Sequence, residues 1–331
     1  IIEINTKAVP SERILDLSFS SGFNSETSLS DGLLYDGGDD DDLGYDDGTR
    51  DFPSFVQRAI NGNQKLDRSN FKTYQLANAG REFVNSELWV IQEGDVPLDN
   101  SVSFTYGDEL NIGIEDILDD ESATIGVLLT AGVKSSWETQ EGIRQTGDIQ
   151  AQGDGTSIVI RGNDKTFKST SNNVTSYLMA VAGIETDSAE LKYTGMYIHK
   201  GTKEARTLQG YDTSDSGDVR EDFTEFFERE LINHQLNYNY LFQNDIQLDV
   251  RLAGGDASRY APYERVVFYE DTDDRGFWRY DVNTGRNQTQ FSYVNDDNEN
   301  FGLDLTFPLQ LGDQEVIIKT GFDQSNNYRD A

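Results

Sequence analysis

Two runs of alternating polar and apolar residues, joined by a short turn, occupy residues 235–252. The apolar positions are Leu236, Tyr238 and Tyr240 in the first run and Ile246, Leu248, Val250 and Leu252 in the second. A period of two predicts β-strands with one apolar and one polar face. The apolar face of such a sheet commonly lies in one of two environments. A soluble sandwich buries it in a core, whereas an outer-membrane barrel turns it to lipid around a polar lumen.

The alternation recurs along the chain, so the class of fold rests on more than one hairpin. Alternating runs lie at 13–22, 101–106, 190–197, 301–307 and 316–322, with weaker ones at 124–132 and 174–183. Together with the two runs of the hairpin, they predict about nine strands and an all-β fold.

The connections between these strands are of two kinds. Turn-forming residues make tight links at 185–188, 243–245 and 311–314, whereas long polar excursions cover 24–100, 134–173, 201–228 and 254–298. Short turns at one end and long loops at the other are typical of outer-membrane barrels. The sequence therefore predicts a segment of an antiparallel up-and-down transmembrane β-barrel, with short periplasmic turns and long extracellular loops.

Composition is compatible with this class and excludes others. Hydrophobic residues make up 36% of the 331 residues and the mean hydropathy is -0.62, but a barrel strand needs an apolar residue only at every second position. No apolar run is long enough for a spanning helix. The formal charge of -33 argues against a nucleic-acid partner, because phosphates would be repelled. Without cysteine, the chain has no disulfide and no thiolate metal site.

Four segments resemble parts of TonB-dependent outer-membrane receptors. They are Ile1-Ile2-Glu3-Ile4-Asn5-Thr6-Lys7, the run from Tyr35 to Gly38 with Leu43 to Arg50, Glu228 to Asn237, and Arg259 to Arg265. The resemblance implies that residues 1–8 end a plug domain or linker. Residues 9–331 would then form the N-terminal part of the barrel, about nine of its roughly 22 strands.

The same resemblance implies a function and a location. The expected activity is energy-coupled uptake of a scarce nutrient, such as a siderophore, cobalamin or an oligosaccharide, through the cell outer membrane. The expected partners are outer-membrane lipid, the small nutrient, and the TonB complex acting through a plug that is absent from this chain. The family's final aromatic-ended strand is not found here either. No cofactor is expected.

In a barrel, the polar residues of the alternating runs would face the lumen or the plug. These residues are Glu190, Lys192, Asn237, Asn239, Asp249, Arg251, Asp304 and Lys319. The alternative interpretation is the ordinary solvent face of a sheet.

Aromatic and basic residues of the predicted long loops are candidates for capturing a ligand, because aromatic rings stack on sugars and guanidinium groups bind anions. The candidates are Trp137, Arg259, Tyr260, Tyr263, Arg265 and Trp278. Equally, these side chains would pack the loops against one another.

An acidic run with interleaved glycines raises the question of a calcium site. Its members are Asp36, Asp39, Asp40, Asp41, Asp42, Asp46 and Asp47. Hard cations take several carboxylate oxygens, but the spacing does not match an EF-hand loop. We interpret the run as a solvated acidic loop, with no metal site.

Nothing in the sequence predicts an enzyme. His199 and His234 are the only histidines, and no zinc-protease, nucleophile-elbow or phosphate-loop motif is present. The main alternative to a receptor is a secreted acidic β-sandwich that binds polysaccharide or calcium. An extracellular hydrolase is a third and weaker alternative.

Overall fold

The computed structural model describes residue 10 and residues 12–84, 87–113, 122–151, 157–213, 218–271, 277–282, 285–312 and 314–331. The strands of the main sheet are β1 (Ile14–Gly22), β4 (Asp99–Gly113), β5 (Ser122–Ala151), β6 (Ser157–Glu185), β7 (Ala189–Tyr211), β8 (Asp218–Leu241), β9 (Gln247–Glu270), β10 (Arg279–Tyr280), β11 (Gln288–Leu311) and β12 (Gln314–Asp330). The elements between β1 and β4 are β2 (Asp31–Tyr35), η1 (Asp41–Leu43), α1 (Ser54–Asn61), α2 (Thr73–Val84), η2 (Glu87–Trp89) and β3 (Ile91–Asp95).

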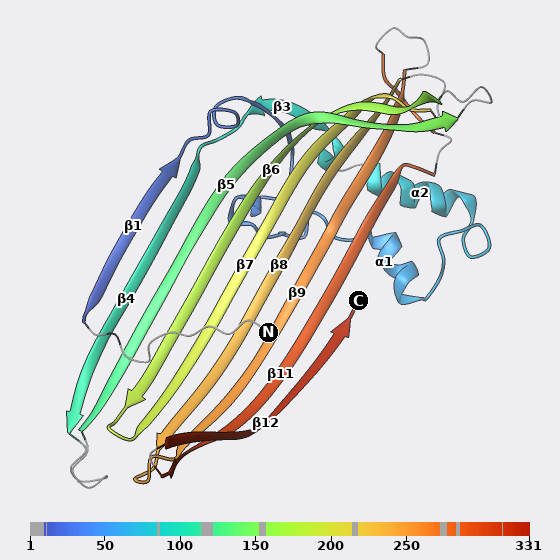
Figure 1. The fold of residues 1–331 in the computed structure, drawn as a ribbon. Coiled ribbons are helices and arrows are strands. Elements are labelled where there is room, and N and C mark those ends of the chain that lie inside the picture. Colours follow the sequence, from blue (N-terminus) through green and yellow to red (C-terminus); the bar gives the residue numbers. More distant parts are fainter. Residues whose placement is uncertain are drawn as a thin grey trace.

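One long antiparallel sheet dominates the molecule (Figure 1). Its strands follow one another in the order β1-β4-β5-β6-β7-β8-β9-β11-β12, and the short β10 pairs with β9. Each run of alternating residues lies within a strand, so the predicted all-β class and the predicted nine principal strands are confirmed. The tight turns at 185–188 and 243–245 connect neighbouring strands, as predicted.

The strands extend much further than the alternating pattern. β5 has 30 residues and β6 has 29, and at about 3.3 Å per residue such strands approach 100 Å. The prediction of long loops at 134–173, 201–228 and 254–298 was therefore wrong for most of these residues, which continue β5 to β11. These extensions carry polar residues on both faces, so they pair through the backbone without giving the period-two signal.

The fourth predicted excursion, residues 24–100, contains structure of its own, and its last two residues already belong to β4; we call residues 23–98 the insert. It holds the β2–β3 hairpin and the helices α1 and α2. In α1, Val56 and Ala59 are buried, which gives the helix one packed side. A small hydrophobic core forms where the hairpin residues Leu33 and Tyr35 pack against Ala205 of β7.

No helix in the described part of the chain is long and apolar enough to cross a membrane. The predicted plug remnant, residues 1–8, lies outside the described residues.

Candidate functional site

The apolar positions of successive strands form one continuous exposed surface, which we call the apolar band. Strand register places one apolar residue of each strand from β4 to β12 directly beside the next. This row consists of Leu110, Ile125, Ile184, Leu191, Tyr238, Val250, Leu303 and Phe322. Several members of the row are well exposed: Leu110 is 62% exposed, Ile184 is 42% and Phe322 is 57%. Large apolar side chains in such a row normally mark an interaction surface.

The band has a similar height on β4, β5 and β11. It runs from Val102 to Leu110 on β4, from Ile125 to Val133 on β5 and from Phe301 to Leu309 on β11. On β1, Leu15, Leu17 and Phe19 are between 71% and 77% exposed and pair with band residues of β4. The band therefore covers the half of the sheet that lies next to the tight turns.

The opposite face of the same strand segments is polar. Register places Glu190, Asn239, Asp249 and Asp304 in one row across β7, β8, β9 and β11. The neighbouring row contains Lys192, Asn237 and Arg251, and Lys319 pairs with Thr306 on the same face. All eight residues predicted to face a lumen thus share one face, opposite the apolar band.

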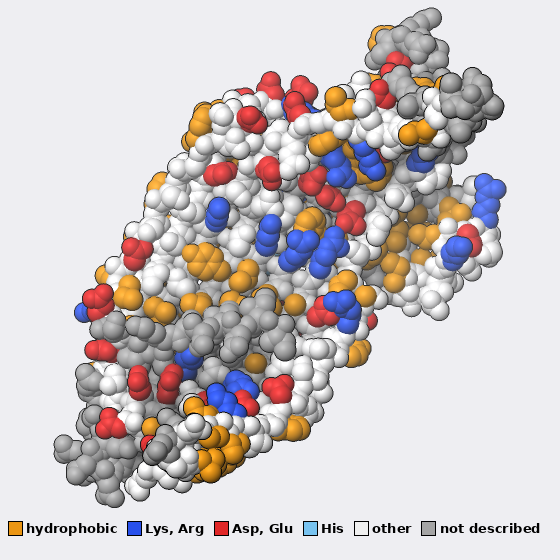
Figure 2. Space-filling view, in the orientation of Figure 1, with side chains coloured by type: hydrophobic (Ala, Val, Ile, Leu, Met, Phe, Trp, Pro, Cys, Tyr) orange, Lys and Arg blue, Asp and Glu red, His pale blue; other side chains and the backbone are white. Residues whose placement is uncertain are grey.

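Charges of both signs are interleaved on this polar face. Arg251 Nη1 lies 2.6 Å from Asp304 Oδ2, and both side chains are about 40% exposed, at 42% and 40%. Figure 2, which views the sheet from the polar side, shows basic and acidic side chains mixed over the strands. This face is therefore hydrophilic, in contrast to the apolar band on the opposite face of the sheet.

The insert packs on the face that carries the apolar band, beyond the band's upper edge, and in Figure 1 its η1 turn lies behind the strands. Gly44 follows η1 with a φ of 81°, a left-handed conformation that favours glycine. A Cβ built on Gly201 of β7 would come within 2.1 Å of the Gly44 carbonyl oxygen. The two backbones can approach this closely only because both residues lack side chains.

Aromatic stacking fixes the insert beside this glycine contact. The Tyr45 ring stacks on His199 of β7 with centroids 3.8 Å apart and planes 7° from parallel. His199 Nε2 lies 2.9 Å from Glu228 Oε2, and Glu228 also accepts a hydrogen bond from the Asp46 backbone N–H. The Tyr45 hydroxyl lies 3.0 Å from that of Tyr197.

A buried ion cluster joins the acidic run to the sheet. The Arg50 guanidinium is fully buried and donates two hydrogen bonds to Asp41, at 2.7 Å and 2.6 Å, and a third of 3.1 Å to Asp46. Lys203 of β7 also contacts Asp41, at 2.8 Å. The Arg50 guanidinium lies 4.1 Å from the ring centroid of Phe226 in β8.

Burial and charge act against each other on these groups. Burial alone would lower the pKa of Arg50, but the hydrogen bonds to Asp41 and Asp46, together with the charges of Tyr35 and Asp41, outweigh that effect and raise the pKa. Burial raises the pKa of Asp46, partly offset by the Arg50 hydrogen bond. Burial also raises the pKa of the Tyr35 hydroxyl, which donates to the Glu225 carbonyl oxygen at 2.8 Å. The cluster is thus built to keep Arg50 charged inside the molecule.

The interpretation of the acidic run as a solvated loop was wrong for part of it. Asp39, Asp40 and Asp42 are exposed. Asp41, in contrast, is 6% exposed and forms ion pairs with the side chains of Arg50 and Lys203. Within the described residues, no group of three or more acidic or histidine side chains is arranged to hold a metal ion. The sequence did carry a signal for the ion cluster, because Arg50 is the only basic residue between Arg13 and Arg58.

The six residues predicted to form a ligand-capture surface in loops lie mostly in strands. Trp137 belongs to β5, and Arg259, Tyr260, Tyr263 and Arg265 belong to β9. Trp278 lies just before β10.

The four residues of β9 are divided between the two faces, and three of them contact other parts of the protein. Arg259 bonds Glu264 at 2.9 Å and Ser292 at 2.8 Å. On the insert side, Arg265 donates to the Phe83 carbonyl oxygen at 3.1 Å and lies over the Trp89 ring, while Tyr263 is 3% exposed. Arg265 therefore holds the insert against β9, a role that the sequence did not indicate, and it also donates to the Tyr263 hydroxyl beside it.

Comparisons with models of protein families, with curated proteins and with solved structures found no match to this chain. The fold and the two faces of the sheet are therefore the basis for a function.

Proposed function

We propose that this chain forms part of the wall of a β-barrel in an outer membrane, with the apolar band toward lipid and the polar face toward a lumen. The observation that carries the proposal is the row of half-buried to exposed apolar residues that runs without interruption across eight strands, backed by a polar face. A lipid environment stabilises such a face, whereas water penalises it by roughly 25 cal/mol for each Å² of apolar surface.

The height of the band supports the same proposal. A tilted strand crosses the hydrocarbon core with about 9–11 residues. The band segments Val102–Leu110, Ile125–Val133 and Phe301–Leu309 each span nine residues. The remaining length of β5 to β9, with polar residues on both faces, would project into water on the side away from the tight turns.

A sandwich requires a second sheet over the apolar face. The two-stranded β2–β3 sheet packs on β6 and β7 beyond the band, and within the described residues no sheet lies over the band itself. The exposed band therefore favours the barrel over a secreted sandwich.

We infer transport from the barrel geometry together with the sequence resemblance. A barrel wall with mixed charges on its inner face suits contact with a plug and passage of a polar solute. Energy-coupled uptake of a scarce nutrient by a TonB-dependent receptor is the activity that fits both observations. The TonB complex would act through a plug domain.

Charge substitutions on the two faces test the proposal. Leu248→Lys places a charge on the apolar band, where the cost imposed by lipid rises from about 0–1 kcal/mol near the interface to about 2–4 kcal/mol at the bilayer midplane. Asn239→Lys places the same charge on the polar face, one strand away. We expect the first variant to fail in assembly into outer membranes and the second to assemble normally, as read from heat-modifiable migration and protease protection.

The reverse result, with Asn239→Lys lost and Leu248→Lys assembled, would mean that the two faces are assigned the wrong way round. Equal assembly of both variants would contradict a membrane location. Uptake is tested separately, by binding of labelled siderophore, cobalamin and oligosaccharide to cells that produce the protein.

A further inference from the structure

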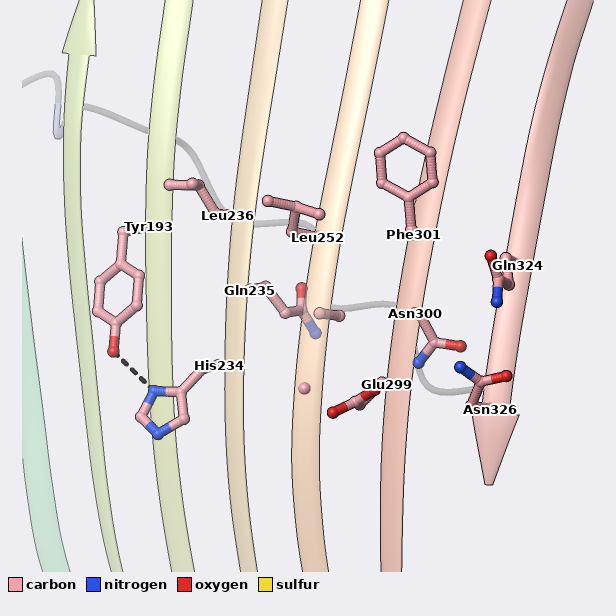
Figure 3. A pocket seen from close by; sticks show the side chains of 12 residues that line it. Tyr193, His234, Gln235, Leu236, Leu252, Glu299, Asn300, Phe301, Gln324 and Asn326 are labelled. Atoms are coloured by element: carbon pink, nitrogen blue, oxygen red, sulfur yellow. Dashed lines mark hydrogen bonds between the residues drawn. The ribbon is translucent and has the colours of Figure 1, made fainter. Parts of the chain in front are cut away.

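A shallow hollow of about 460 Å³ opens on the apolar face, at the upper edge of the band (Figure 3). Pockets that hold small ligands commonly fall between about 300 and 1,000 Å³. Two neighbouring rows of side chains line it. The apolar row belongs to the band and contains Tyr193, Leu236, Leu252 and Phe301.

The second row is polar. It lies two residues away on each strand, on the side farther from the tight turns, and contains His234, Gly254, Glu299 and Asn326. The hollow therefore joins an apolar wall to a polar wall across a single step in register. A ligand that fills it must be amphipathic.

A glycine keeps the hollow open. A Cβ added to Gly254 would meet only the Asn298 carbonyl oxygen, at 3.9 Å. A side chain at this position would therefore start in open space and extend into the hollow.

The polar wall has hydrogen-bonding capacity that the protein does not use. The His234 Nδ1 atom lies 2.7 Å from the Tyr193 hydroxyl, and Figure 3 shows the two rings meeting at one side of the hollow. In the described part of the chain, the side chains of Glu299 and Asn326 make no hydrogen bond or ion pair. Gln324, opposite Phe301, is likewise without a protein partner in this part.

The charge of this wall selects among lipid headgroups. On this face its lining includes one carboxylate, Glu299, and the amides of Gln324 and Asn326, but no lysine or arginine. The neighbouring residues Asp256 and Asp297, one further row away, add negative charge. A phosphate would be repelled, whereas the hydroxyls of a sugar can donate to Glu299 and exchange hydrogen bonds with the amides.

We propose that this hollow holds a membrane lipid with a neutral saccharide headgroup. Its acyl chains would lie along Leu236, Leu252 and Phe301, and its sugar would bond Glu299 and Asn326. The inference rests on the proposed membrane location of the band.

Nanodiscs of phosphatidylcholine that contain either monogalactosyl diacylglycerol or phosphatidylglycerol provide the test. The native protein and its variants are incorporated, released with detergent and examined by native mass spectrometry for retained lipid. We expect one retained galactolipid per protein and little phosphatidylglycerol. Gly254→Leu, which fills the hollow, should reduce galactolipid retention by about tenfold or more, equivalent to about 1.4 kcal/mol or more.

Val127→Leu adds bulk to the band on β5, several strands away from the hollow, and it should leave retention unchanged. Glu299→Lys keeps the hollow but reverses its charge, and it should shift the preference to phosphatidylglycerol. Unchanged retention in Gly254→Leu, or equal retention of the two lipids by the native protein, would overturn the lipid site. Failure to enter nanodiscs would instead contradict the membrane location.

Discussion

At the scale of single residues, Arg50 is the group whose removal should cost most. It is buried and satisfies Asp41 and Asp46, so its loss leaves buried carboxylates with less compensation. We expect Arg50→Met to weaken attachment of the insert by about 3 kcal/mol, the low end for a broken buried pair, because Lys203 still neutralises Asp41. Faster proteolysis of residues 23–98 would report the change.

The double variant Arg50→Met with Asp41→Leu removes both charges of the pair. Since apolar replacements of a buried ion pair are often neutral or stabilising, it should be less sensitive to protease than Arg50→Met alone. If the double variant is cleaved faster than Arg50→Met, the ion pair stabilises the insert by more than the free-energy cost of burying its two charges.

Glu225 introduces a pH dependence at the same scale. Burial, followed by the charge of Glu204, raises the pKa of Glu225 to about 7 from an ordinary value of 4.5. The folded protein therefore binds more protons than the unfolded chain between these values, so the free energy of unfolding falls as pH rises from 4.5 to about 7. The register explains the shift, because Glu204, Glu225 and Glu264 stand side by side on three strands.

Glu225→Gln should remove this dependence. We expect the variant to be more stable than the parent protein at pH 8 and similar to it at pH 4, measured as midpoints of urea unfolding. Glu109→Gln, at an exposed glutamate of β4, is the matched control, and its unfolding midpoint should equal that of the parent protein at both pH values. A parent-like loss of stability in Glu225→Gln between pH 4.5 and 7 would assign the dependence to another group.

At the scale of elements, the insert depends on one backbone contact with β7. Because a Cβ at Gly201 would collide with the Gly44 backbone, Gly201→Ala should push η1 off the sheet, at a cost of about 1–3 kcal/mol for overpacking. Hydrogen exchange of residues 41–50 should rise. Gly254→Ala, another strand glycine with open space above it, should leave this exchange unchanged.

The elements also divide into those that the sequence predicted and those that it did not. The strands of the band were predictable because one face is apolar. The alternation of Leu236, Tyr238 and Leu248 with polar residues indicates this face in the sequence. The outer halves of β5 and β6 were not, because polar residues on both faces erase the period although the ladder between these strands continues. The eight polar-face residues were predictable from the same alternation, because each occupies a position between two apolar positions and therefore points to the opposite face.

The site on the insert was harder to predict for a different reason. Tyr45 and His199, or Arg50 and Phe226, meet across more than 150 residues of sequence. No local period relates them, and the lone cation in the acidic run indicated a partner without indicating β7 and β8. Tyr263 and Arg265 were assigned to a loop because their segment lacks alternation, although they belong to β9.

For the whole molecule, the distribution of polarity decides its behaviour in water. The net charge of -33 opposes association, but the charges lie mainly outside the apolar band. The band exposes large apolar side chains on each strand of the main sheet path, whose outer strands in the described part of the chain are β1 and β12. An apolar face and two outer strands both favour self-association.

We therefore expect the protein to self-associate in detergent-free buffer and to become monodisperse when micelles cover the band. Sedimentation velocity in both conditions, with the bound detergent measured, checks this expectation. Leu17→Asp together with Leu303→Asp should reduce association in buffer and lower the bound detergent, because both residues lie on the band. Asp16→Asn with Asp304→Asn, on the opposite face, is the matched control and should change neither quantity. A detergent-free monomer that binds no micelle would contradict the membrane-wall proposal and favour a water-soluble β-protein.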